Sequence, residues 1–114
     1  MADYSKMSDF EINKLVASSL GGFESEDIFE LQGVIFKRHG KYQYSVFDPC
    51  NDPSEAWPII LSNLIALKPV KLYVGGHRWF ASKGDGDFGL KFADDNPLRA
   101  AMIVYLMMKE SENG

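Results

Sequence analysis

Residues 94–108 read DDNPLRAAMIVYLMM, and this segment constrains the fold more than any other. Its first four residues are typical of a helix start, with capping side chains and acids that suit the positive end of the helix dipole. From Leu98 to Met108 only Arg99 is charged. A helix that is apolar all round needs partners on several sides. We therefore expect it to be either the central helix of the fold or half of a subunit interface.

A second helix start lies near the N-terminus. Ser8 and Glu11 have the spacing of a capping box, in which each side chain binds the backbone N–H of the other residue, and Met7 and Ile12 are placed as a hydrophobic staple. Apolar residues follow at helical spacing, and Gly21-Gly22 favours a left-handed exit. The pattern predicts an amphipathic helix of about three turns.

A third helix start lies in the middle of the chain. Asp52 can cap it, and Pro53 follows where its missing N–H costs nothing. Pro58 indicates that the helix either kinks there or begins near Trp57. Because residues 59–67 are strongly apolar, we expect this helix to be mostly buried.

Two hairpins separate the helices. In the first, residues 28–37 and 41–47 flank His39-Gly40, and a short loop there pairs Lys37 with Tyr42 and Ile35 with Tyr44. Gly33 is a candidate bulge within the first of these strands.

In the second hairpin, Gly75-Gly76 permits a type I′ turn, which sets Val74 opposite His77. Alternation along the strands then predicts two faces. The core face comprises Val70, Leu72, Val74, His77, Trp79 and Ala81. The other face carries Lys71, Tyr73, Arg78 and Phe80, and residues 90–93 are a candidate last strand.

The order of elements is therefore α-ββ-α-ββ-α. This order predicts the α+β class: an antiparallel sheet of two hairpins packed with three helices, with the C-terminal helix central. The length of 114 residues and the 46% hydrophobic content are typical of a single globular domain spanning 1–114 and exclude a disordered chain.

The net charge of −4 is unevenly distributed. Residues 1–30 carry −5, residues 31–83 carry +4 and residues 84–114 carry −3. The acidic ends can be solvated helix faces, whereas the basic middle can bind anions because clustered cations concentrate potential locally.

Cations and aromatic rings on the hairpins are candidate nucleic-acid or anion contacts, since cations neutralise phosphates and rings stack on bases. These residues are Lys37, Arg38, Lys41, Lys71, Tyr73, Arg78 and Phe80. The alternative is that charged strand ends protect the sheet edges from pairing with other chains.

Metal and nucleophile signals are weak. The run Asp85-Gly86-Asp87 resembles the opening of a calcium loop, but the later ligand positions do not match, which favours a turn. His39, His77 and Cys50 lack the spacing of a zinc motif, so we predict no metal and no cofactor. A lone cysteine is typical of a packed residue more than of a nucleophile, and it suits a reducing cytosol.

The segments 47–60 and 95–108, with the opening Tyr4-Ser5 and residues 13–17, resemble the NinX-like family of small tailed-phage and prophage proteins, a domain of unknown function. The resemblance implies an accessory protein made in the cytoplasm of a bacterial host, and it carries over no catalytic residue. In the first segment, Asp48, Asn51 and Asp52 with Trp57-Pro58 are expected to make a rigid turn whose polar groups can cap a helix and whose indole can close the core. Asp48, Asn51 and Trp57 are alternatively contacts for a partner.

These observations predict a non-enzymatic protein-binding or adaptor module whose partner is an unidentified host or phage protein. The alternative is weak, sequence-tolerant nucleic-acid binding through the basic and aromatic hairpins, and a third possibility is a small enzyme that uses Cys50 or His77. The longest apolar run, Ala100 to Met108, is about half of what a membrane span needs, and no secretion signal is recognisable, so we expect no membrane association. The oligomeric state is left open between monomer and homodimer.

Overall fold

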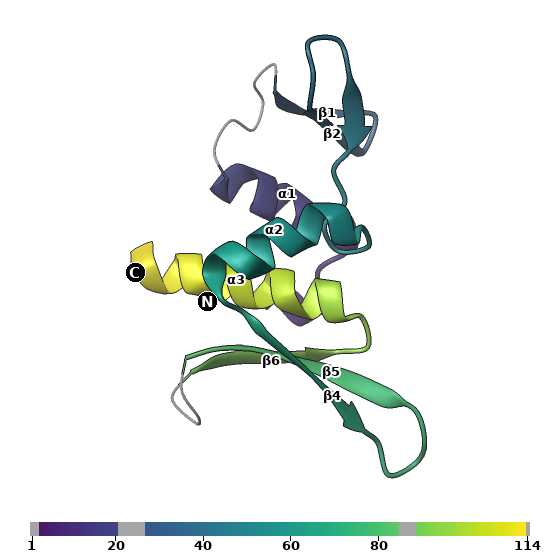
Figure 1. Cartoon of the computed structure of the whole chain (residues 1–114), viewed down its shortest axis with the longest axis vertical. Helices are drawn as coiled ribbons and strands as arrows, with labels where there is room; N and C mark the ends of the chain where they lie inside the picture. The colour runs from purple at the N-terminus through teal and green to yellow at the C-terminus, as the bar shows by residue number, and fades with distance from the viewer. Residues whose placement is uncertain (1–2, 21–26, 85–88, 114) are drawn as a thin grey trace.

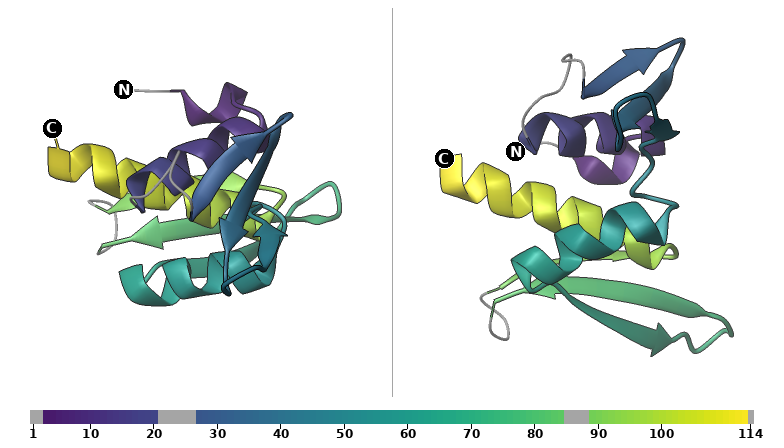
Figure 2. Two further views of the ribbon diagram at one scale, coloured as in Figure 1. Left: turned by 90° about the horizontal axis from the view of Figure 1, so that it is seen from above. Right: turned by 45° about the horizontal axis from the view of Figure 1, so that its top comes forward.

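The computed structural model describes residues 3–20, 27–84 and 89–113. Its centre is helix α3 (Pro97–Asn113), against which helix α1 (Asp9–Ser19), helix α2 (Pro53–Asn63) and one of two small sheets all pack. Figure 1 shows α1 and α2 above α3 and that sheet below it. In the right-hand view of Figure 2, α1 lies above α3 and α2 lies below it, so the two helices cover different sides of α3.

Helix α3 is buried around its whole circumference over residues 100–106. Asn96 caps its start, since the Asn96 Oδ1 accepts hydrogen bonds from the backbone N–H groups of Leu98 at 2.9 Å and Arg99 at 3.3 Å. The predicted central position of the C-terminal helix is confirmed. The subunit-interface alternative for this helix is not needed, because the chain's own elements cover it.

Helix α1 begins as the sequence indicates. The Ser8 hydroxyl accepts from the Glu11 N–H at 3.1 Å, and the Glu11 carboxylate accepts from the Ser8 N–H at 3.5 Å, so the capping box is present. Ile12, Val16 and Ala17 are fully buried. The expected exit at Gly21-Gly22 lies outside the described residues.

Helix α2 begins at Pro53 with Asp52 as its cap, so the later start near Trp57 is wrong. The helix runs through Pro58, which has no N–H to donate to the Ser54 carbonyl, and both residues are exposed. Only one side of the helix is buried, through Ala56, Ile59 and Ile60. The expectation of a mostly buried helix is therefore wrong.

Sheet A consists of β1 (Ile28–Leu31), β2 (Val34–Arg38) and β3 (Tyr44–Val46), in that order and antiparallel. The prediction of one continuous strand over residues 28–37 with a bulge at Gly33 is wrong. Gln32 (φ 52°) and Gly33 (φ 78°) form a two-residue turn between β1 and β2. The predicted pairing is also wrong: Lys37 lies opposite Ser45, since residues 39–43 form a longer loop.

Sheet B consists of β4 (Ala66–Lys71), β5 (His77–Lys83) and β6 (Leu90–Asp94), with β5 in the middle. The last short strand is confirmed as β6. The predicted register of the hairpin is wrong by three positions, because Lys71, and not Val74, lies opposite His77. The turn spans Leu72 to Gly76, where the Leu72 N–H bonds to the Gly76 carbonyl at 3.0 Å.

An odd shift in register exchanges the faces of one strand relative to the other. Val70 therefore lies opposite Arg78 and not on the core face, and Leu72 and Val74 belong to the turn. Ala81 is fully buried as predicted.

The α+β class is confirmed. The order of elements, after a short 3-10 helix η1 (Tyr4–Lys6), is α-βββ-α-βββ-α, with two separate three-stranded antiparallel sheets in place of one sheet built from two hairpins. Sheet A lies at one end of the 48 Å long axis and sheet B lies toward the other (Figure 1).

The central position of α3 predicts a large loss of stability when its core is truncated. Ile103 is fully buried, so Ile103→Ala should lower the free energy of unfolding by about 2–5 kcal/mol in urea denaturation. Leu61→Ala on α2 is the control, because its side chain is 55% exposed and its loss should cost less than about 1 kcal/mol. Equal losses for the two variants would contradict the arrangement.

Candidate functional site

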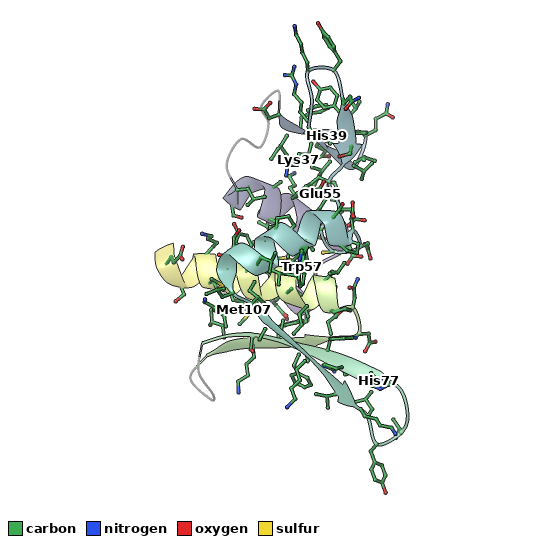
Figure 3. The ribbon with its side chains drawn as sticks, in the orientation of Figure 1. Lys37, His39, Glu55, Trp57, His77 and Met107 are labelled. Atoms are coloured by element: carbon green, nitrogen blue, oxygen red, sulfur yellow. The ribbon has the colours of Figure 1, made fainter. Side chains whose placement is uncertain are left out.

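The basic and aromatic candidates do not form one surface. The two hairpins that carry them lie toward opposite ends of the molecule, with the helices between them (Figure 1). Figure 3 shows His39 in the first hairpin, above Lys37, and His77 in the second hairpin, toward opposite ends of the molecule. The predicted contacts therefore lie on two separate surfaces of the molecule.

At the first hairpin, two of the three predicted cations are engaged within the protein. Lys37 Nζ lies 3.6 Å from the Glu55 carboxylate on α2, and Figure 3 shows the two side chains near each other. Arg38 donates from Nε to the Gly40 carbonyl at 3.0 Å and from Nη2 to the Lys41 carbonyl at 2.5 Å, which holds the loop. Lys41 is exposed at the tip, with its Nζ 5.6 Å from the centre of the Tyr42 ring.

At the second hairpin, the four predicted residues lie on different parts of the hairpin and not on one face. Lys71 ends β4, and Tyr73 is fully exposed in the turn. Arg78 and Phe80 share the outer face of β5, where Arg78 Nη2 donates to the Ala93 carbonyl at 3.4 Å and Arg78 Nε lies 3.5 Å from the Asp95 carboxylate. The corrected register removes Lys71 and Tyr73 from this face.

The turn over residues 47–52 belongs to a polar cluster that joins α1 to the start of α3. Asn13, only 5% exposed, donates to the Asp48 carboxylate at 2.6 Å and accepts from the Cys50 N–H at 3.1 Å. Asn51 donates to the carboxylates of Asp48 and Asp9. Asp48 and Asn51, two of the predicted partner contacts, thus form internal bonds that hold the turn in place.

Arg99 completes the polar cluster from α3. Its Nη1 donates to the Asp9 carboxylate at 2.8 Å, and its Nη2 donates to the carbonyls of Tyr4 at 3.2 Å and Met7 at 2.7 Å. Asp94 lies 3.6 Å from its Nε. The single cation of the apolar segment therefore ties the N-terminal residues to the central helix, a role that sequence reasoning missed because all of these bonds are long-range.

Cys50 lies inside this cluster with no exposed surface. Burial, and then the nearby Asp9 carboxylate, raises the pKa of its thiol to about 12, so the sulfur is protonated at neutral pH. Residues 3–20, 27–84 and 89–113 contain no group of three or more His, Cys, Asp or Glu side chains that could hold a metal ion. The arrangement offers Cys50 neither a neighbouring histidine base nor access to substrate.

The exposed side of α2 is the most unusual surface of the described chain. Trp57, Leu61 and Leu64 lie four and three positions apart, which places them along one side of the helix, and they are 54%, 55% and 76% exposed. We call these three residues the α2 stripe. The prediction that the Trp57 indole closes the core is wrong. Leu61 and Leu64 were not predicted as site residues, because the sequence pattern assigned them to the core.

Leu64 has a second distinguishing feature. It ends α2 in the left-handed conformation, with φ 54° and ψ 46°, where glycine or asparagine is usual. A residue with a Cβ pays roughly 1–2 kcal/mol there, and the Leu64 side chain recovers little of this by burial. Together with Trp57 and Leu61 it borders a hollow of about 430 Å³ between α2 and β4, whose other lining residues are Ile60, Ile65, Ala66 and Leu67.

None of the described helices is long and apolar enough to cross a bilayer. The family model described as Bacteriophage P22, NinX matches residues 3–109. No curated protein and no solved structure matches the chain. The matched range includes the polar cluster and the α2 stripe.

The polar cluster predicts that Asn13 is needed for stability. Asn13→Ala removes the partner of the buried Cys50 N–H and should cost about 1–3 kcal/mol in urea denaturation. Asn63→Ala is the control, because its amide makes a local bond to the Ile59 carbonyl of its own helix and its loss should cost less. If the two substitutions cost the same, the cluster does not hold the turn.

The state of Cys50 predicts slow alkylation. With the thiol buried and its pKa raised to about 12, iodoacetamide at pH 8 should label the folded protein much more slowly than the protein unfolded in urea. Mass spectrometry measures the labelled fraction over time. Equal rates in the two states would restore Cys50 as a candidate nucleophile.

Proposed function

Because the chain belongs to the bacteriophage P22 NinX family, it is a phage accessory protein, and we propose that it acts as a non-enzymatic module that binds another protein. The observation that carries the proposal is the α2 stripe. A tryptophan and two leucines, each more than half exposed, lie together beside the buried side of α2. Grouped exposed apolar side chains of this kind mark interaction sites.

The chemistry of α2 supports an apolar partner surface. The only charged residue of the helix is Glu55, and its carboxylate lies 3.6 Å from Lys37. The outward side of the helix therefore presents no charge that a partner would have to desolvate. Depletion of charge with an aromatic anchor is typical of the buried centre of an interface.

The form of the site favours a helix as the occupant. The α2 stripe and the hollow beside it are arranged along a helix, which suits the apolar side of an amphipathic helix of the partner. Strand addition to the edge of β4 is disfavoured, because Pro69 has no N–H to donate and Lys68 and Lys71 flank it. We propose a host or phage protein that presents such a helix in the cytoplasm of the host.

The strained ending of α2 supports the same proposal. Leu64 adopts a left-handed backbone, and yet its side chain is 76% exposed. Backbone strain that brings no packing within the chain is typical of functional positions. A partner that covers Leu64 would supply the missing burial.

The proposal predicts that Leu61→Ser lowers the affinity for the partner at least tenfold without unfolding the protein, since central apolar anchors contribute most of the binding energy. The partner is first identified by capture from infected host cells and is then purified. Binding of the two purified proteins is measured by isothermal titration calorimetry. Trp57→Ala should weaken binding to a similar extent.

Leu31→Ser is the matched control, because Leu31 is 58% exposed on sheet A, away from α2, and its loss should leave the affinity unchanged. Circular dichroism checks that each variant is folded. Equal affinity of wild type and Leu61→Ser overturns the proposal. A dimer in light scattering that Leu61→Ser dissociates also overturns it, because the occupant is then a second copy of the chain.

A further inference from the structure

The outer face of sheet B is a second surface, separate from α2. The inner face is fixed by Ala81, which is fully buried, and by Leu67, Leu90 and Phe92, which pack against the core. Because side chains alternate along a strand, the positions between these point away from α3. We call them the open face of sheet B: Ala66, Lys68, Val70, Arg78, Phe80, Ser82, Lys91 and Ala93.

The charged residues of the open face of sheet B all have the same sign. Three of its eight residues are cations and none is acidic. Asp95, which follows β6, lies 3.5 Å from Arg78 Nε. The eight residues of the face therefore carry a net positive charge in a protein of net charge −4, and local charge governs the approach of an anion.

The register places an aromatic ring between the cations. Phe80 lies on the central strand and is 39% exposed, although it is a large apolar side chain. Lys68 is directly opposite it on β4, and Lys91 lies on β6 opposite Ser82, two positions further along β5. Since neighbouring strands are about 4.8 Å apart, cations stand on both sides of the ring within the reach of their side chains.

Protection of sheet edges does not explain this arrangement. Edge protection requires charge on β4 and β6, which Lys68 and Lys91 supply, but it does not require an exposed aromatic ring on the central strand. An acidic protein surface would pair with the cations but would leave the ring without a specific partner. A ligand that combines regularly spaced anions with flat apolar rings uses both features.

We propose that the open face of sheet B binds single-stranded nucleic acid, with a base stacked on Phe80 and the adjoining phosphates held by Lys68 and Lys91. Stacking on an aromatic side chain is tolerant of sequence, and cations along the strand neutralise the backbone. A duplex buries the faces of its bases and cannot stack on the ring. This site differs from the hairpin tips, because it uses Lys68 and Lys91 and does not use Lys71 or Tyr73.

The test is fluorescence anisotropy with a labelled oligothymidylate of about 15 nucleotides, a length within the range of one binding face. Affinity should fall steeply between about 50 and 200 mM salt. Lys68→Glu should weaken binding at least tenfold at the lower salt concentration and reduce the salt slope. Phe80→Leu should weaken binding about tenfold with the salt slope unchanged, because it removes stacking and no charge. Phe80→Tyr should retain binding.

The matched control is Lys41→Glu, which reverses the same charge at the exposed tip of the other hairpin and should leave the affinity unchanged. Circular dichroism establishes that the variants are folded. The proposal is overturned by absence of binding at about 50 mM salt, by an equal loss in Lys41→Glu, or by equal affinity for the duplex. Competition by polyglutamate as effective as that by unlabelled oligothymidylate would also overturn it, because the face would then recognise anions of any kind.

Discussion

The burial of α3 is the constraint on which the rest of the structure depends. Seven consecutive residues of this helix, 100–106, are buried, so every direction around it must be covered by another element. Helices α1 and α2 and sheet B provide the cover. Each of these elements packs one face against α3 and leaves other residues exposed to solvent. The positions of the outer surfaces follow from that arrangement.

The start of α3 adds a polar constraint to the apolar one. Arg99 enters the interior with only 12% of its side chain exposed, and such a cation must be paired or hydrogen-bonded to avoid a large desolvation cost. Asp9 and the carbonyls of Tyr4 and Met7 meet that need. Asn96 extends the same cluster by donating to the Cys50 carbonyl at 2.7 Å. The segments that resemble the family therefore meet at one place, although they are far apart in the sequence.

Local interactions were predictable from the sequence, and long-range ones were not. The caps at Ser8 and Asp52 involve residues two or three positions apart, so their patterns are visible in the chain. The register of β4 on β5 depends on whether Gly75-Gly76 forms the centre or the end of the turn, which composition does not determine. A shift of three positions then moved Val70 to the other face. The exposure of Trp57 could not be predicted, because an apolar helix sequence does not reveal which side its neighbours cover.

The two proposed surfaces have the same origin: α2 and sheet B each pack one side against α3 and leave the other side exposed. Stability accounts for the inner sides of α2 and sheet B, through Ile59, Ile60 and Ala81, but it does not account for Trp57 on one outer side or Phe80 on the other. Because both elements pack on α3, ligands at their outer sides need not compete for space, and α3 fixes their relative positions. A chain that held a protein on α2 and a nucleic-acid strand on sheet B would connect the two through its buried central helix. This arrangement gives a physical basis for the proposed adaptor function.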